Sequence, residues 1–153
     1  MEATFALLKP EVAQQNLIGE VIRRLEQAGL HVTELRLLTA PRELAERHYG
    51  EEIARKHGEH VRRWLLDYIC SGPVVALVLT GAEAIRIARE VGGQSPFPED
   101  CGPGTIRGDL AEDTRERAMA EERAVRNLIH TSDSPAAAQQ EIALWFGEIA
   151  PPS

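Results

Sequence analysis

Residues 74–79, with the sequence Val-Val-Ala-Leu-Val-Leu, form an unbroken apolar run directly after Gly72 and Pro73. A short, continuous run that is rich in β-branched residues predicts a strand covered by other parts of the chain. A strand with one face in water would instead alternate apolar and polar residues. At 153 residues the chain is long enough to supply that cover from a single domain over residues 1–153.

The rest of the chain alternates between strand-like and helix-like segments. Apolar residues at helical spacing, followed by Gly29, predict a helix over residues 17–28, and an alternating pattern predicts a strand over residues 31–38. This order favours an α/β protein, either a doubly wound sheet or a ferredoxin-like split βαβ sandwich. The other predicted segments are strands at 4–8 and 128–129, helices at 82–91 and 136–146, a helical region at 41–71 with breaks near Gly50 and Gly58, a loop at 92–104 and a charged segment of helical composition at 111–126.

Composition excludes several classes of protein. The net charge of -7 argues against a general nucleic-acid-binding protein, which needs a basic face. No segment has the pattern of a signal peptide and no apolar run approaches membrane-spanning length, so we expect a cytoplasmic protein with no membrane contact. Cys70 and Cys101 have neither a zinc spacing nor a redox spacing and are expected to be free thiols. His57 and His60, near Glu59, are expected on a charged helix face rather than on a metal ion.

A histidine near the C-terminus is the first candidate for chemistry. His130 ends a short apolar run, Asn127 precedes it by three residues, and Ser-Asp-Ser follows at 132–134. A neutral imidazole can act as a base or a nucleophile at physiological pH. The polar residues also have a structural interpretation, because they precede Pro135 and an alanine-rich segment, which is the arrangement of a helix cap.

Two further clusters carry positive charge. Lys9 ends the first strand, where its ammonium must find an anion or water because an unpaired buried charge is costly. Residues 103–109, Pro-Gly-Thr-Ile-Arg-Gly-Asp, set Arg107 among glycines, and a guanidinium there suits a bidentate contact with phosphate. This segment lacks the spacing of a P-loop. Together with Arg89, Ser95 and His130, these groups are the ones that phosphoryl transfer through a phosphohistidine needs.

Over nearly its whole length the chain resembles a nucleoside diphosphate kinase. The residues that carry the resemblance are 4–10, 17–29, 48–49, 71–78, 103–109, 126–130, 132–134 and 141–146. The resemblance implies a ferredoxin-like βαββαβ core, an α+β sandwich whose four-stranded antiparallel sheet is covered by helices. It also implies a ping-pong reaction with Mg²⁺-bound nucleotides. In that reaction the γ-phosphate of ATP or another nucleoside triphosphate passes to a histidine and then to a nucleoside diphosphate.

The same resemblance implies a role for each site residue. His130 matches the phosphorylated histidine, Glu141 matches a glutamate that fixes its tautomer, and Ser132 matches a serine nearby. Lys9 and Tyr49 match residues that assist transfer. No protein ligand to the metal is implied, because the nucleotide phosphates carry the Mg²⁺. Family members are generally hexamers or tetramers, so a homo-oligomer is expected. The residues that match those holding sugar and phosphates are Lys9, Tyr49, Arg89, Ser95, Arg107 and Asn127.

The chain departs from the family pattern at three places. Residues 11–12 are Glu-Val where the family usually has Asp-Gly, and Thr131 replaces the glycine that usually follows the histidine. The third place is the nucleobase clamp. Residues 53–64 contain no matching phenylalanine, and Ala124 stands at the position of a valine, inside an insertion over residues 111–125. The candidates to contact the base instead are His57, His60, Val61 and Trp64.

Three functions can be weighed on this basis. An active kinase with an altered nucleotide site accounts for the histidine, lysine, arginines, asparagine and glutamate together. A nucleotide-binding regulatory or scaffold protein with weak or no transfer is the alternative, supported by Thr131 and the changed base region. An acyl hydrolase that uses Ser132 with His130 is disfavoured, since no nucleophile elbow surrounds the serine.

Overall fold

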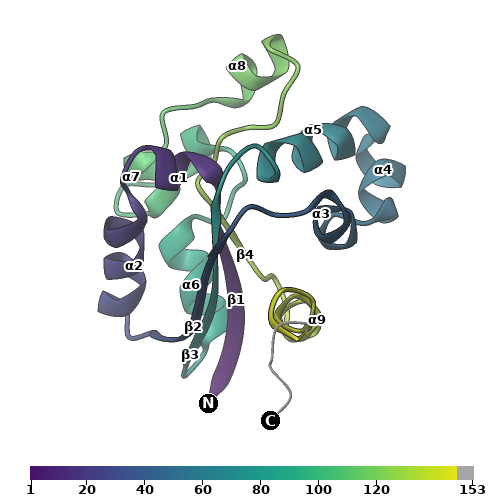
Figure 1. Cartoon of the computed structure of the whole chain (residues 1–153). Helices are drawn as coiled ribbons and strands as arrows, with labels where there is room; N and C mark the ends of the chain where they lie inside the picture. The colour runs from purple at the N-terminus through teal and green to yellow at the C-terminus, as the bar shows by residue number, and fades with distance from the viewer. Residues whose placement is uncertain (148–153) are drawn as a thin grey trace.

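A four-stranded antiparallel sheet forms the centre of the computed structural model, which describes residues 1–147 (Figure 1). The central strand β1 pairs with β3 from Glu2, opposite Gly81, to Leu8, opposite Val75, and its other edge pairs with β4. This topology excludes the doubly wound sheet and confirms the ferredoxin-like alternative. The strands are β1 (Glu2–Leu8), β2 (His31–Leu38), β3 (Val74–Gly81) and β4 (Ile129–Thr131), in the spatial order β2-β3-β1-β4.

Helices connect the strands and cover both faces of the sheet. The helix predicted before Gly29 ends at that glycine because its φ of +97° is one that other residues rarely adopt. Within residues 1–147, no helix is both long enough and apolar enough to span a membrane. The helices are α1 (Pro10–Gln14), α2 (Ile18–Gln27), α3 (Arg42–His48), α4 (Glu51–His57), α5 (Glu59–Ile69), α6 (Ala84–Gly92), the 3-10 turn η1 (Pro98–Asp100), α7 (Ile106–Leu110), α8 (Arg115–Ala120) and α9 (Pro135–Phe146).

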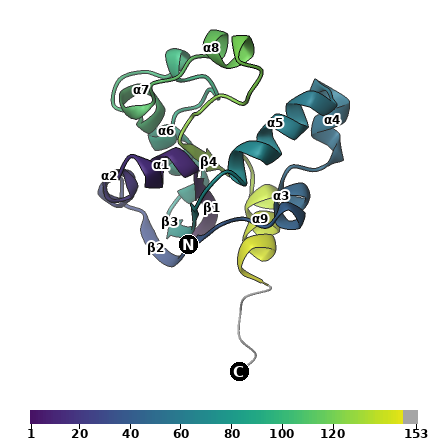
Figure 2. The ribbon, with the colours of Figure 1, turned by 45° about the horizontal axis from the view of Figure 1, so that its top comes forward.

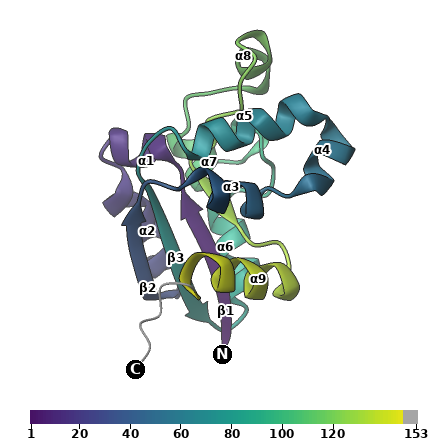
Figure 3. The same cartoon turned by 45° about the vertical axis from the view of Figure 1, so that its right-hand side comes forward.

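The core has two layers, because successive side chains of β1 point to opposite faces of the sheet. Ala6 and Leu8 pack with α2 and α6 on one face, whereas Phe5 and Leu7 pack with α3, α5 and α9 on the other (Figures 1 and 3). The run at 74–79 is buried on both faces, as predicted. His130 in β4 lies opposite Leu7, so it faces the layer that contains α9.

The inserted segment is less helical than its composition suggests. Within residues 111–126 only α8 is helical. A helix needs an apolar face to pack against the protein, and even α8 buries only Ala118. The segment is closed instead by the buried Asp113 carboxylate, which contacts the Arg123 guanidinium at 2.7 and 3.1 Å. Asp113 also accepts a hydrogen bond from the Arg126 amide at 2.8 Å. α8 therefore projects from the same end of the molecule as the α4–α5 pair (Figure 2).

Two short helices were not predicted from the sequence. Pro10 ends β1 but occupies the first turn of α1, where the missing N–H of proline costs nothing. α7 begins after Thr105, whose hydroxyl accepts the Gly108 amide at 2.9 Å. Both helices have only five residues, too few to show a helical period.

Candidate active site

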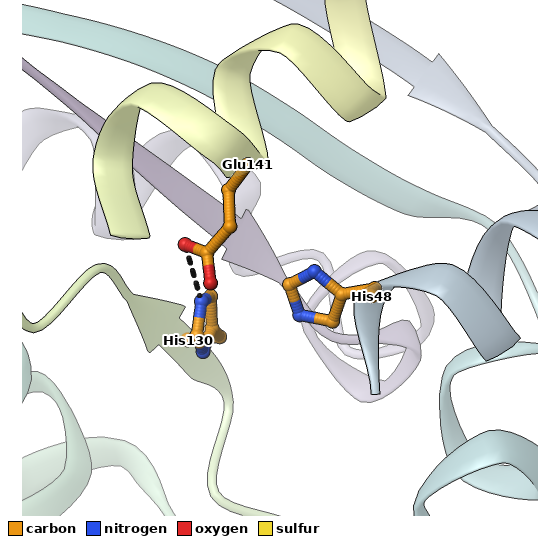
Figure 4. A group of neighbouring side chains, drawn as sticks. All are labelled: His48, His130 and Glu141. Atoms are coloured by element: carbon orange, nitrogen blue, oxygen red, sulfur yellow. Dashed lines mark hydrogen bonds and ion pairs between the residues drawn. The ribbon is translucent and has the colours of Figure 1, made fainter. Parts of the chain in front are cut away.

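β4 presents His130 to a carboxylate from α9. The Nε2 atom of His130 lies 3.0 Å from Oε1 of Glu141 (Figure 4). The Ser132 hydroxyl donates to the same oxygen at 2.5 Å. The side chains of His130 and Glu141 are 24% and 16% exposed, so the pair is shielded but open to a ligand. A carboxylate at Nε2 favours the tautomer with its proton there. The Nδ1 lone pair is then free to act as a nucleophile.

His48, at the end of α3, packs against the imidazole of His130. The two rings have centroids 4.7 Å apart and lie nearly perpendicular, at 83°. The indole N–H of Trp145 donates to His48 Nδ1 at 3.1 Å, which puts the remaining proton of a neutral His48 on Nε2. Burial lowers the pKa of His48 well below its usual range, and His130 and Lys9 act in the same direction. His48 is therefore an uncharged ring beside His130, and its Nε2 edge faces that imidazole (Figure 4).

His48, His130 and Glu141 are also the one group of three within residues 1–147 whose ligand atoms are close enough to hold a metal ion, all within 4.8 Å of one another. A metal at Nε2 of His48 would need the lone pair at that nitrogen. The Trp145 hydrogen bond places the proton there instead, so His48 would have to give up that bond before it could bind a metal.

Lys9 and Asn127 meet where β1 ends beside β4. Lys9 is 3% exposed, and its Nζ donates to Oδ1 of Asn127 at 3.3 Å. The Asn127 amide group in turn donates to the Pro96 carbonyl at 3.0 Å. Burial lowers the pKa of Lys9 to about 7, with Glu11 opposing the shift and Arg107 adding to it. An anion beside this ammonium would restore its full charge.

Arg107 connects two loops of the site through backbone carbonyls. Its Nη1 donates to the Gly93 carbonyl at 2.9 Å and the Ser95 carbonyl at 2.8 Å, and its Nε donates to the Asn127 carbonyl at 3.1 Å. Its Nη2 donates to the Ile129 carbonyl. Four of its five donors are thus engaged within the protein, which leaves one N–H for a phosphate.

The glycine after this arginine serves the packing of the loop on itself. A Cβ atom at Gly108 would lie 2.2 Å from the carbonyl oxygen of Gly102, so only glycine allows α7 to approach residues 101–102 this closely. Gly108 thus has a packing role next to Arg107 in the Pro-Gly-Thr-Ile-Arg-Gly-Asp segment.

The other predicted phosphate-binding residues lie around these loops. Arg89 lines a cavity of about 440 Å³ with Asp133 and Ser134, and its guanidinium has no protein partner within residues 1–147. Ser95 lines a neighbouring cavity that shares Gln94, and its hydroxyl accepts the Phe97 amide at 3.1 Å. The structure therefore does not bring the Arg89 and Ser95 side chains into a single cavity.

Tyr49 and the residues after the histidine complete the surroundings. Tyr49 is 8% exposed, and burial raises the pKa of its phenol, with the charge of Glu141 adding to the shift. The phenol therefore stays protonated. Thr131 is buried in β4, opposite Ala6, and is accommodated in regular strand conformation. Ser134 caps α9 by accepting the Ala137 amide at 3.1 Å, as the cap interpretation predicted.

The region that should hold the base contains Trp64. Its side chain and Ala124 line a cavity of about 200 Å³ together with Tyr68 and Arg126. His60 packs edge-on against the Trp64 indole, with ring centroids 5.1 Å apart. Of the four candidates named from the sequence, Trp64 is the one that lines this cavity with Ala124.

Several residues of the site were not predicted as site residues. His48 and Trp145 lie beside the His130 ring. Glu11 and Tyr68 contact the backbone that precedes His130 in the chain. They come from four separate helices, so no local spacing relates them. The sequence did give signals: Glu11 departs from the family pattern, and His48 and Trp145 lie in stretches that carry the family resemblance.

Comparison with known proteins identifies the family of the chain. The family model for nucleoside diphosphate kinase matches residues 2–150. A nucleoside diphosphate kinase of Archaeoglobus fulgidus is 42% identical over 148 residues, covering 97% of this chain and 88% of the relative. One from Staphylococcus aureus is 43% identical over 148 residues, covering 97% of this chain and 89% of the relative.

The solved structures that resemble the chain are also nucleoside diphosphate kinases. A nucleoside-diphosphate kinase of Borrelia burgdorferi, described as a transition-state mimic with bound vanadate and ADP, superposes with a TM-score of 0.90 at 33% identity. That comparison covers 95% of this chain and 86% of the relative. An NDP kinase of Pyrobaculum aerophilum gives a TM-score of 0.87 at 34% identity, with 95% of both chains covered. The chain therefore belongs to the nucleoside diphosphate kinase family, whose members are phosphotransferases.

Proposed function

We propose that the transfer runs through a phosphohistidine on Nδ1 of His130. Nδ1 attacks the γ-phosphorus of a nucleoside triphosphate, an N–P bond forms, and the bond to the β-phosphate oxygen breaks to release a nucleoside diphosphate. A terminal oxygen of a second diphosphate then attacks the same phosphorus and frees the histidine. The observation that carries this proposal is the 3.0 Å contact between Glu141 and Nε2, which leaves Nδ1 unprotonated.

We assign the handling of charge and sugar to the residues around His130. Among residues 1–147, Arg89 has a guanidinium free of protein partners and Arg107 has one free donor, and Lys9 gains charge when an anion binds. Asn127 holds the Lys9 ammonium, so the two are positioned to share a sugar hydroxyl. Bound ADP and vanadate in the 33% identical Borrelia relative support a phosphate site of this kind.

We further propose that Mg²⁺ enters with the nucleotide. Mg²⁺ prefers oxygen ligands and is commonly bound by substrate phosphates with few protein ligands. Within residues 1–147, the only close group of three metal-ligand side chains contains two imidazoles, which is a poor set for Mg²⁺. The residues present therefore fit a metal carried by the phosphates, where it would neutralise charge on the transferred group.

Assembly and location are proposed on two observations. Leu35 and Leu37 on the edge strand β2 are 54% and 59% exposed, and an exposed apolar edge strand favours pairing with another copy of the chain. We therefore propose a homo-oligomer, a hexamer or tetramer, formed by the single domain over residues 1–153. Cys70 and Cys101 are free, which suits the reducing cytoplasm.

The reaction is tested by exchange between two nucleotides. We expect γ-labelled ATP and unlabelled GDP to give labelled GTP at a turnover of about 1–10³ s⁻¹, the ordinary range for enzymes. The assay uses the purified chain with Mg²⁺, and chromatography separates the products. Binding of ADP by folded protein without any labelled GTP would support the regulatory alternative instead.

We propose that the base lies between α5 and the inserted segment, against the Trp64 indole. Base–aromatic stacking is worth about 1–3 kcal/mol, so Trp64→Ala should raise KM by about 5- to 150-fold and leave the amount of phosphoenzyme formed at saturating ATP unchanged. Lys56→Ala is the matched control, because Lys56 is exposed in the last turn of α4 and is not a candidate to contact the base. Equal KM values for Trp64→Ala and the wild type would place the base elsewhere.

A further inference from the structure

Glu11, in the first turn of α1, is a buried carboxylate held by uncharged donors. The residue is 5% exposed, and its Oε2 accepts the Leu128 amide at 3.0 Å and also the Tyr68 hydroxyl. Its Oε1 is buried and has no hydrogen-bond partner in the part of the chain that the structure describes. Burying a carboxylate that lacks full hydrogen bonding costs stability. The role of Glu11 therefore depends on the contacts that its carboxylate makes.

Tyr68, in α5, extends this contact to the neighbouring residue. Its phenol oxygen accepts the Asn127 amide at 3.1 Å, so the two side chains hold consecutive amides, those of Asn127 and Leu128. The Tyr68 ring also lies beneath the Lys9 ammonium, with Nζ 4.7 Å from the ring centroid. Tyr68 thus contacts both the backbone of Asn127 and the Lys9 ammonium that the Asn127 side chain binds, while Glu11 holds the next amide.

The backbone held in this way is strained. Leu128 has a φ of +72°, and the Ile129 amide donates to the Asn127 carbonyl at 2.8 Å, which closes a γ-turn around Leu128. A residue with a side chain stays in such a conformation only when its surroundings fix it. The turn directly follows Asn127, so its relaxation would move the Asn127 side chain, whereas the His130 ring is held separately by Glu141.

We propose that Glu11 and Tyr68 are positioning residues that hold the Leu128 turn. They thereby fix the side-chain amide of Asn127 beside Lys9, where the nucleotide binds. This inference rests on the proposed function. Both residues act through Asn127 and Lys9, so their effect belongs mainly to nucleotide binding. Phosphorylation of His130, whose ring is oriented separately by Glu141, should change little.

Glu11 also acts on the charge of Lys9, and this separates its effect from that of Tyr68. Burial lowers the pKa of Lys9 to about 7, Arg107 of α7 acts in the same direction, and Glu11 of α1 opposes both. Tyr68 of α5 and His48 of α3 face Lys9 as uncharged groups. Removing the negative charge of Glu11 therefore lowers the pH at which Lys9 loses its proton. Removing the Tyr68 hydroxyl leaves the charges around Lys9 unchanged.

The test compares Tyr68→Phe, Glu11→Gln and the wild type. Both variants should raise the KM for nucleotide by about 5- to 20-fold, with kcat within about threefold, because they loosen the position of a binding group. In the pH profile of kcat/KM, which reports the free enzyme, activity that needs charged Lys9 falls as the pH rises. This fall should occur at lower pH in Glu11→Gln and at the wild-type pH in Tyr68→Phe. Glu26→Gln, on the exposed face of α2, is the matched control.

The outcomes separate this proposal from a purely structural role. Variants with wild-type KM and an unchanged pH profile would overturn it, even if their unfolding midpoints fell. Tyr68→Phe keeps the ring and its packing, so it remains informative if Glu11→Gln does not fold. Calorimetric Kd values for ADP provide a readout that needs no transfer. A wild type that binds ADP but transfers nothing would contradict the proposed function, while the Kd comparison would still test the role of Glu11 and Tyr68.

Discussion

Replacing His130 by glutamine abolishes the phosphoenzyme and lowers nucleotide exchange by at least about 10⁴-fold, because the amide has no nucleophilic lone pair on nitrogen. The substitution keeps a hydrogen-bonding group near Glu141 and adds no charge, so the fold should survive. Incubation of the wild type with γ-labelled ATP and Mg²⁺ should give label that is lost in acid, as a phosphohistidine requires. The variant should remain unlabelled while ADP still binds.

His31→Gln is the matched control for this experiment. His31 is an exposed histidine at the start of β2, on the edge strand farthest from β4. The His31→Gln protein should be labelled as fully as the wild type. Acid-labile label on His130→Gln, at wild-type stoichiometry, would place the phosphate on another residue. An unlabelled but folded wild type would remove the phosphohistidine mechanism altogether.

Replacing Arg107 by lysine lowers the free energy of unfolding by about 3–5 kcal/mol and reduces exchange strongly. The guanidinium satisfies four carbonyls from two loops, and a single ammonium reaches only some of them. A buried carbonyl left without its donor costs about 1–3 kcal/mol. The loops that carry Ser95 and Asn127 then separate, so the binding groups lose their common position. Urea unfolding measures the first effect and steady-state exchange measures the second.

The matched control for this substitution is Arg86→Lys. Arg86 also contacts several oxygens, from Glu83 and Glu90, but its side chain is 52% exposed. Exposed ion pairs contribute little, so the urea midpoint and the exchange rate should match the wild type. An Arg107→Lys protein with the wild-type midpoint would show that the four carbonyls find other partners, and the structural role assigned to Arg107 would be wrong.

The prediction of the fold from the sequence succeeded where a segment has a long and regular pattern. β3 has a continuous apolar run, and α2 has apolar residues at helical spacing before Gly29. The segment over 111–126 was the difficult case. Its helical composition reflects preferences of single residues, but a helix in water needs an apolar face to pack, and α8 buries only Ala118.

The chemistry of the site could be predicted further than its geometry. His130, Glu141, Lys9 and Asn127 were named from their matches to the family pattern, and the structure brings them together as two contacting pairs. Arg107 was named as a phosphate-binding residue, and the structure adds that its guanidinium also links backbone carbonyls of separate segments. Residue type indicates what a side chain can bind, but the partner that it binds depends on which loops meet it.

The sequence by itself determined the family and the order of the longer strands and helices, and it named His130 as the candidate nucleophile, because these depend on local patterns and on matching residues. Only the tertiary structure decided which elements surround that nucleophile. The antiparallel pairing of β1 with β4 sets His130 opposite Leu7, and α3 and α9 then bring His48 and Glu141 to its ring. Residues as far apart as Glu11 and Leu128 come into contact only when the sheet closes. Such contacts leave no spacing in the chain that could be recognised beforehand.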